Sequence, residues 1–318
     1  MSSLFLLLLT SAMPASAADL LMYKDHSEGV AFEDAAALAG HDIVVTDDVA
    51  DFQREYGRGG FDVVIVDTYL DYPPIGIDDV VLDRARTHEP VVYSNWALDT
   101  SLLQDSLGVT TGADLTTPLD LTRSAGATHD IFEGVPDLVT WTYDQYTDDG
   151  DALTPLGGWL AVQHDTGTGA LAFTNGDTTA VLGFMPGNFI GSDNDADGHN
   201  DVSELLANMF DVLLAGRPTL SVDGACPSLV TLRLSGLTPT SKVALVSGAE
   251  LGFSTIPTGS CAGTPLPIEG DPALLGVFDT DSMGGVEIES VVTREVCGQV
   301  RTVAVDLATC KTSAPLQL

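Results

Sequence analysis

The chain has 318 residues, with 46 acidic and 12 basic side chains and a formal net charge of −34. So negative a protein is not expected to bind nucleic acids or anionic membranes, because their phosphates would be repelled. The charge is unevenly distributed. Residues 217–318 hold 10 of the acids and 6 of the bases, so their net charge is −4, and the net charge of the remaining residues is −30. We therefore expect two domains of different character.

The N-terminus resembles a signal peptide. An apolar run at residues 4–9 precedes Ala15, Ser16 and Ala17, which predicts a signal over residues 1–18 with cleavage after Ala17 or Ala18. The run is too short to cross a bilayer, and no later segment is long and apolar enough to do so. We expect a secreted or periplasmic protein, whose partner would be an extracellular or cell-envelope ligand.

From residue 19 onward, short apolar runs alternate with helical stretches. This order predicts a doubly wound α/β domain with a mostly parallel sheet over residues 19–216. The predicted strands are 20–24, 42–47, 61–68 and 90–96, and the helices are 30–40, a segment ending near Gly57, 77–88 and 202–214. Residues 110–128 are polar and loop-like. Further strands are expected near 139–146, 158–164, 168–174 and 179–185.

The order of these elements resembles the class I glutamine amidotransferase-like group, in its branches without amidotransferase activity. The segments that carry the resemblance are VVIVDT, PVVYSNW, the turn HDIFEGV at 129–135 and the hairpin GALAFTNGDTTAVLGFMPGNF at 169–189. The resemblance covers residues 19–214 and implies a nucleophile, usually cysteine, in a sharp turn after a central strand. Ser94 is nearest to that position. It is followed by Asn95 and Trp96 without the glycine pair that such a turn needs, so the catalytic cysteine is lacking.

An alternative function is a secreted hydrolase that works at the carboxyl ends of the strands. Ser94 would be its nucleophile with His129 or His164 as base, or Asp25 and Asp67 would hold a metal-bound water. Open α/β sheets bind ligands at these strand ends. The pocket candidates there are Asp25, His26, Asp67, Tyr69 and Asn95.

Residues 193–204, DNDADGHNDVSE, resemble an EF-hand calcium loop. Acids stand at loop positions 1, 3, 5 and 9, glycine at 6 and glutamate at 12. Without a cation, so many neighbouring carboxylates would repel one another. The ligands that the pattern implies are Asp193, Asp195, Asp197, the backbone carbonyl of His199, Asp201 directly or through water, and Glu204 with both oxygens. The other interpretation is a solvated acidic turn.

This loop departs from a paired EF-hand in three ways. A strand at 179–184 precedes it where an EF-hand has a helix, position 8 is Asn200 rather than an aliphatic residue, and the sequence contains no second loop. We therefore predict a single loop that joins a strand to a helix. By analogy with weak extracellular modules, its calcium dissociation constant would be about 10⁻⁴ to 10⁻³ M.

Residues 217–318 have the composition of an all-β domain. Short alternating strands between turn residues predict a β-sandwich of immunoglobulin or fibronectin type. The predicted strands are 219–223, 229–235, 242–247, 252–256, 273–279, 285–292 and 301–307. All four cysteines lie here, and their spacing resembles small stapled β modules at the C-termini of secreted bacterial proteins. Four cysteines in an exported chain predict two disulfides.

Strand geometry narrows the three ways of pairing these cysteines. Cys297 and Cys310 flank one predicted strand and would lie about 20 Å apart, which excludes a bond between them. If the strands run up and down in chain order, Cys226 pairs with Cys310 and Cys261 with Cys297. Together, these observations favour a secreted, acidic, calcium-binding protein with a non-catalytic α/β domain that acts as a binding or structural module.

Overall fold

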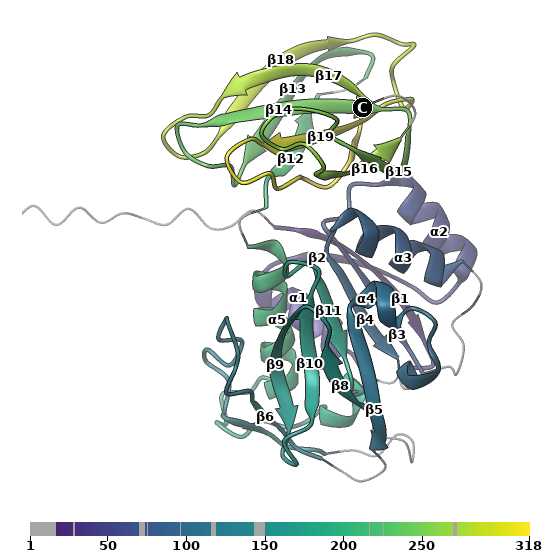
Figure 1. Ribbon diagram of the computed structural model, residues 1–318, viewed down its shortest axis with the longest axis vertical. Coiled ribbons are helices and arrows are strands. Elements are labelled where there is room, and N and C mark those ends of the chain that lie inside the picture. Colours follow the sequence, from purple (N-terminus) through teal and green to yellow (C-terminus); the bar gives the residue numbers. More distant parts are fainter. Residues whose placement is uncertain are drawn as a thin grey trace, which may run out of the picture.

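A computed structural model describes residues 17–318 except 28, 70–73, 75, 96, 116–118, 143–149, 216, 225 and 270–271. An α/β part ends at residue 215, and a part made only of β-strands and connecting loops begins at residue 217 and lies above it in Figure 1. Within the described residues, no helix has the length and apolar character needed to span a membrane. The predicted signal peptide lies outside the described residues except for Ala17 and Ala18.

Five parallel strands form one half of the large sheet, in the order β2, β1, β3, β4 and β11. Their bounds are Asp42–Thr46, Asp19–Asp25, Val63–Thr68, Val91–Asn95 and Thr179–Leu182. Both faces of β3 and β4 are buried, as expected for apolar runs in the middle of a parallel sheet. These five strands lie where the sequence predicts them, within a few residues.

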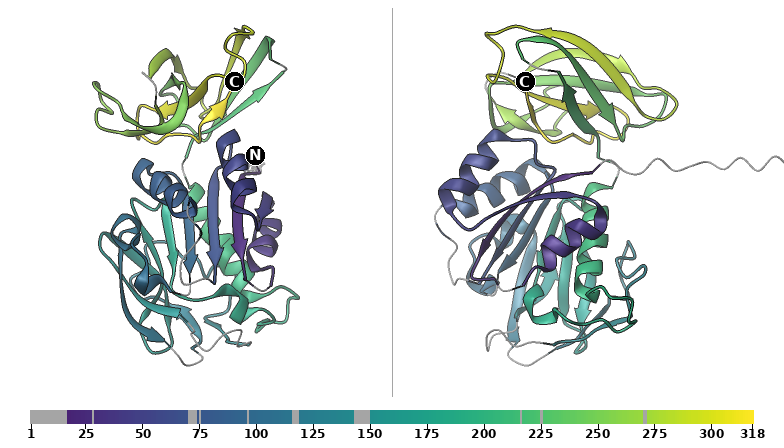
Figure 2. Two further views of the ribbon diagram at one scale, coloured as in Figure 1. Left: turned by 90° about the vertical axis from the view of Figure 1, so that its right-hand side faces the viewer. Right: turned by 180° about the vertical axis from the view of Figure 1, so that it is seen from behind.

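Helices cover both faces of this parallel half, as Figure 2 shows. They are α1 (Ala31–Ala39), α2 (Val49–Arg58), α3 (Ile77–Thr87), α4 (Gln104–Leu107) and α5 (Asp201–Leu214), with short 3-10 turns η1 (Leu98–Thr100) and η2 (Pro186–Phe189). Phe32 of α1 and Phe210 of α5 share a core with Met22 on one face of β1. Phe52 of α2 shares a second core with Leu21 on the other face. The alternation of neighbouring strand residues between the two cores confirms a sheet wound on both sides.

The other half of the sheet is antiparallel, which corrects the prediction of a mostly parallel sheet. Beyond β11 come β10, β9, β6 and β7, while β8 pairs with β10 and β5 pairs with β8. Their bounds are β5 Val109–Leu115, β6 Leu121–Arg123, β7 Leu138–Val139, β8 Gly150–Pro155, β9 Gly158–His164 and β10 Gly169–Thr174. Short turns such as residues 175–178 join these strands. A parallel connection needs a crossover of a dozen or more residues, so such turns permit only antiparallel neighbours.

The region from residue 110 to 128 is not the loop that its polar sequence predicts. It contains most of β5 and all of β6, whose side chains are largely exposed or half-buried. Because strands with solvent-facing side chains do not show a long apolar run, composition alone misses them. Of the strand predicted at 139–146, only Val139 lies in β7 (Leu138–Val139), and residues 143–149 fall outside the described part of the chain.

The C-terminal part consists of three small sheets. The first contains β12 (Thr219–Asp223), β13 (Ser228–Ser235) and β18 (Val286–Val292), and the second contains β17 (Ala273–Asp279), β14 (Lys242–Gly248), β19 (Arg301–Asp306) and β20 (Leu316–Gln317). The third is the pair β15 (Glu250–Thr255) and β16 (Pro265–Glu269). Leu232 and Leu234 of β13 share a core with Leu245 of β14 and Ala304 of β19, so the first two sheets pack against each other.

Two disulfides cross-link this part, Cys226 to Cys297 and Cys261 to Cys310. The number of bonds and the exclusion of a Cys297–Cys310 bond are confirmed, but the predicted partners are wrong. The error lies in the assumption that the strands run up and down in chain order. The start of β13 lies beside the end of β18, which brings Cys226, two residues before β13, next to Cys297 in the segment after β18.

The C-terminal ends of α2 and α3 face the β part. Arg301 of β19 donates to the carbonyls of Gly57 and Arg58 at the end of α2. Arg217 donates to the carbonyl of His88, just after α3, at 2.8 Å. Cations at helix C-termini satisfy the last free carbonyls and complement the helix dipole. Two arginines therefore link the β part to the α/β part through backbone carbonyls.

Candidate metal centre

Three carboxylates converge in the loop between η2 and α5. Asp193, Asp195 and Asp197 each bring one oxygen within 4.8 Å of the others, and all three side chains are exposed. The backbone takes positive φ at Ala196 (+61°) and Gly198 (+96°), and this tight turn lets alternate side chains meet at one point. The structure thus brings together three of the six predicted ligands.

Backbone amides hold these carboxylates in place. Asp193 accepts hydrogen bonds from the N–H groups of Asp197 at 3.1 Å and Gly198 at 3.2 Å. Asp197 accepts one from the N–H of His199 at 2.8 Å. A carboxylate has about four acceptor positions, so one or two such bonds orient the group and still leave lone pairs for a hard cation.

Asp201, the predicted ninth loop residue, is buried at the start of α5. Its carboxylate accepts hydrogen bonds from the hydroxyl of Ser192 and from the side-chain amide of Asn194 at 2.8 Å. It also accepts one from the backbone N–H of Asn194 at 3.2 Å. Asp201 is not one of the three converging acids. It ties the beginning of the loop to the beginning of the helix, a role that the loop pattern does not indicate.

Glu204, the twelfth loop residue, lies in the first turn of α5. Burial, together with the nearby charges of Asp197 and Asp195, raises the pKa of its carboxyl group to about 7. Its Oε2 atom is buried and has no hydrogen-bond partner within the described residues. The carboxyl group of Glu204 is therefore close enough to the converging loop acids for their negative charges to act on it.

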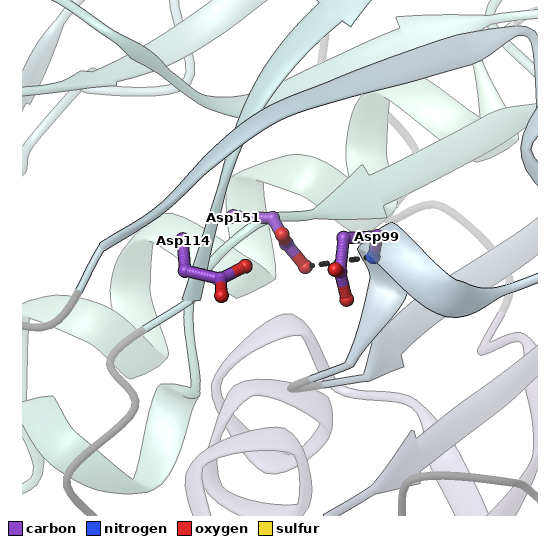
Figure 3. A group of neighbouring side chains, drawn as sticks. All are labelled: Asp99, Asp114 and Asp151. Carbon is purple, nitrogen blue, oxygen red and sulfur yellow. Dashed lines mark hydrogen bonds between the residues drawn. The ribbon is translucent and has the colours of Figure 1, made fainter.

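A second group of acids comes together in the antiparallel half of the sheet. Figure 3 shows Asp99 of η1, Asp114 of β5 and Asp151 of β8 side by side, and one oxygen of each lies within 4.8 Å of the others. Asp151 is buried and accepts a hydrogen bond from the backbone N–H of Asp99 at 3.1 Å. Asp114 lies opposite Asp151 in the β5–β8 pairing. No local sequence pattern indicates this group, because its members are 15 and 37 residues apart.

The candidate catalytic residues Ser94, His129 and His164 do not come together. Ser94 is buried in β4, and His164 ends β9, with β11 and β10 between these strands. At the usual strand spacing, the strands that hold Ser94 and His164 are about 14 Å apart. Burial lowers the pKa of His164 to about 4, which makes it a weak base at neutral pH. His129 Nε2 lies 3.8 Å from a carboxylate oxygen of Asp177, which precedes β11. Ser94 lies opposite Leu182, at the other end of β11.

The five pocket candidates lie at or just beyond the carboxyl ends of β1, β3 and β4, as predicted, and Asp67, Tyr69 and Asn95 are buried there. Asp25 contacts His26 at 3.4 Å. The hydroxyl of Tyr69 accepts a hydrogen bond from the backbone N–H of Gly187 at 3.3 Å, and Asn95 accepts one from the backbone two residues on at 2.9 Å. These polar groups hold neighbouring loops in position.

Asp67 has the most perturbed environment at this edge of the sheet. Burial raises the pKa of its carboxyl group to about 6, although the hydrogen bond from the Ser27 hydroxyl and the charge of Lys24 partly oppose that shift. Asp25 and Asp67 are not among the converging acids in the described part of the chain. The hydrolase alternative with a metal-bound water on these two residues thus gains no support.

No family model matches the sequence, and no curated protein matches it. Among solved structures, a ThuA-like protein of Bacteroides uniformis is 12% identical, with 64% of this chain and 95% of that chain covered and a TM-score of 0.44. A glutamine amidotransferase of Thermotoga maritima is 10% identical, with 63% and 99% covered and a TM-score of 0.41. One of Methylobacillus flagellatus is 11% identical, with 66% and 97% covered and a TM-score of 0.39. With TM-scores below 0.5, these similarities assign neither a family nor an activity.

Proposed function

We propose that this chain is an exported calcium-binding protein whose amidotransferase-like α/β part is a non-catalytic binding or structural module. The observation that carries the proposal is the convergence of Asp193, Asp195 and Asp197, each held by backbone N–H groups. The two disulfides are consistent with an oxidising compartment.

Calcium suits this loop better than magnesium. Ca²⁺ accepts six to eight oxygens in flexible geometry, whereas Mg²⁺ demands a near-ideal octahedron and keeps several waters. Asp193, Asp195 and Asp197 would supply carboxylate oxygens, the backbone carbonyl of His199 and the nearby Glu204 would add others, and water would complete the shell.

The bound ion would stabilise the start of α5. This helix packs on α1, and its residues Phe210 and Leu206 belong to the core that covers one face of the sheet. For a dissociation constant of about 10⁻⁴ to 10⁻³ M, calcium at about 10 mM would raise the free energy of unfolding by about 1.4 to 2.7 kcal/mol. This gain corresponds to a rise in Tm of about 3 to 10 °C for a domain of this size.

The test combines calcium titration calorimetry with thermal unfolding in calcium and in EDTA. Wild type is expected to bind calcium and to melt higher in its presence. Asp193→Ala and Glu204→Gln should remove both effects, since each takes oxygens from the loop. Asp114→Asn is the matched control, because it changes an exposed acid of the other group and should preserve the loop site. The proposal fails if wild type takes up no calcium, or if Asp114→Asn abolishes binding while Asp193→Ala does not.

A further inference from the structure

A cavity of about 370 Å³ lies where the α/β part meets the β part. His88 after α3, the turn at 175–178 and the end of α5 line one side, and Pro265 and Lys311 of the β part line the other. Cavities of this size hold small organic molecules. The cavity involves none of the calcium-loop residues, so it is independent of the proposed metal function.

The charge of this cavity is opposite to that of the protein. Lys311 and Arg217, two of only 12 basic residues in the chain, line it together with His88 and His129. Asp177 is the acid in the lining, and it already accepts a hydrogen bond from the indole N–H of Trp159 at 2.7 Å. In a chain with 46 acids, such a concentration of cations is not expected from composition alone.

Both cations contact neutral backbone carbonyls. Lys311 Nζ donates to the carbonyl of Ala215 at 3.0 Å, and Arg217 Nη1 donates to the carbonyl of His88 at 2.8 Å. No acid lies within ion-pair distance of either cation in the described part of the chain. Because Ala215 and Arg217 are two positions apart, the two cations are tied to the same short segment.

Within the residues that the structure describes, the guanidinium of Arg217 lacks hydrogen-bond partners for some of its N–H groups. Its Nη2 atom is buried and has no hydrogen-bond partner among the described residues. Burial lowers the pKa of the guanidinium to about 10; the charge of Glu89 opposes this shift, and the charge of Arg84 adds to it. A half-buried guanidinium with a buried nitrogen that lacks a partner is costly, and a bound anion would offset that cost.

We propose that this cavity binds a small organic anion whose carboxylate or phosphate group lies between Lys311 and Arg217 and whose apolar body packs on Val212, Leu213 and Pro265. The apolar lining explains why the ligand is organic, and the two cations explain its charge. The disulfide between Cys261 and Cys310 holds the residue before Lys311, so the β part supplies a fixed wall of the site.

The test measures binding of phenyl phosphate, benzoate, inorganic phosphate and benzyl alcohol to the full mature chain in calcium-free buffer by calorimetry. Phenyl phosphate or benzoate is expected to bind, and whichever is tighter identifies the head group. Lys311→Gln should weaken that binding about tenfold, because it removes one charged hydrogen bond. Lys311→Arg keeps the charge and should stay within about threefold of wild type. Lys242→Gln is the matched control. Lys242 is exposed, its Nζ atom lies 2.7 Å from a carboxylate oxygen of Asp279, and neither residue lines the cavity.

Several results would overturn this site. Absence of binding by both aromatic anions refutes it, and so does an equal loss of affinity in Lys311→Gln and Lys242→Gln. If benzyl alcohol binds as tightly as the anions, the charge of the ligand does not contribute to binding. If inorganic phosphate binds as tightly as phenyl phosphate, the apolar wall does not contribute. Because no calcium is present, each of these outcomes is separate from failure of the calcium loop.

Discussion

Within the described residues, two groups of three acids converge, and they form in different ways. In the loop, Asp193, Asp195 and Asp197 alternate along five residues, and one tight turn brings them together. In the sheet, Asp99, Asp114 and Asp151 come from three elements, and the pairing of β5 with β8 places two of them opposite each other. The first group is encoded locally, whereas the second exists only after the antiparallel half has formed.

This difference shows where sequence patterns are informative about chemistry. A local group carries its own geometry, because a spacing of two residues in a turn fixes which side chains meet. A group assembled by strand pairing depends on register, and a shift of one residue would send Asp114 to the opposite face of the sheet. The following substitutions test this contrast, from the largest expected effect to the smallest.

Asp201→Ala should have the largest effect on stability. The change removes a buried acceptor that binds the buried Ser192 hydroxyl and the backbone and side-chain N–H groups of Asn194, and it leaves a void at the start of α5. We expect the free energy of unfolding in EDTA to fall by about 3 to 5 kcal/mol, as measured by urea unfolding. Asp201→Asn keeps one acceptor oxygen and should lose less. A loss below about 1 kcal/mol for Asp201→Ala would mean that the loop is not fastened to α5 through this residue.

Asp67→Asn tests an acid whose position is set by the sheet. In the folded protein the pKa of Asp67 is raised from 3.8 to about 6, so the folded state holds an extra proton between these two pH values. The stability that Asp67 contributes is therefore complete below pH 3.8 and is lost as the pH rises through about 6. Relative to wild type, Asp67→Asn should gain up to about 3 kcal/mol above pH 7 and little at pH 4.

The measurement for Asp67→Asn is urea unfolding of both proteins across pH 4 to 8. Asp47→Asn serves as the control, because Asp47 is exposed and should change stability little at any pH. A difference between Asp67→Asn and wild type that does not grow with pH would contradict the raised pKa.

Gly198→Ala should have the smallest effect and should act on the loop alone. Its φ of +96° is unfavourable for alanine, although the added Cβ would meet no other atom within 4 Å. We expect a loss of about 1 kcal/mol and calcium binding about fivefold weaker by calorimetry. Gly126→Ala is the matched control: its Cβ is also free of contacts and its φ is not positive, so no loss is expected. Equal losses in both variants would refute the role of the turn at Gly198.

The prediction of the fold succeeded where the pattern is local. The alternation of apolar runs and helices identified the parallel strands and the long helices to within a few residues, because burial on both faces leaves continuous apolar segments. It missed β5, β6 and β8, which pair with neighbours far along the chain and have partly polar sequences. The disulfide partners were wrong for the same reason, since they depend on the order of strands in space.

The sequence by itself determined the acidic character of the chain, the doubly wound half of the sheet and the convergence of Asp193, Asp195 and Asp197, because these follow from composition and from residues close together in the chain. Only the tertiary structure decided that half of the large sheet is antiparallel, that Asp201 fastens the loop, and that Arg217 and Lys311 meet across one cavity. Such arrangements depend on register and on packing between distant segments, and no local spacing records them.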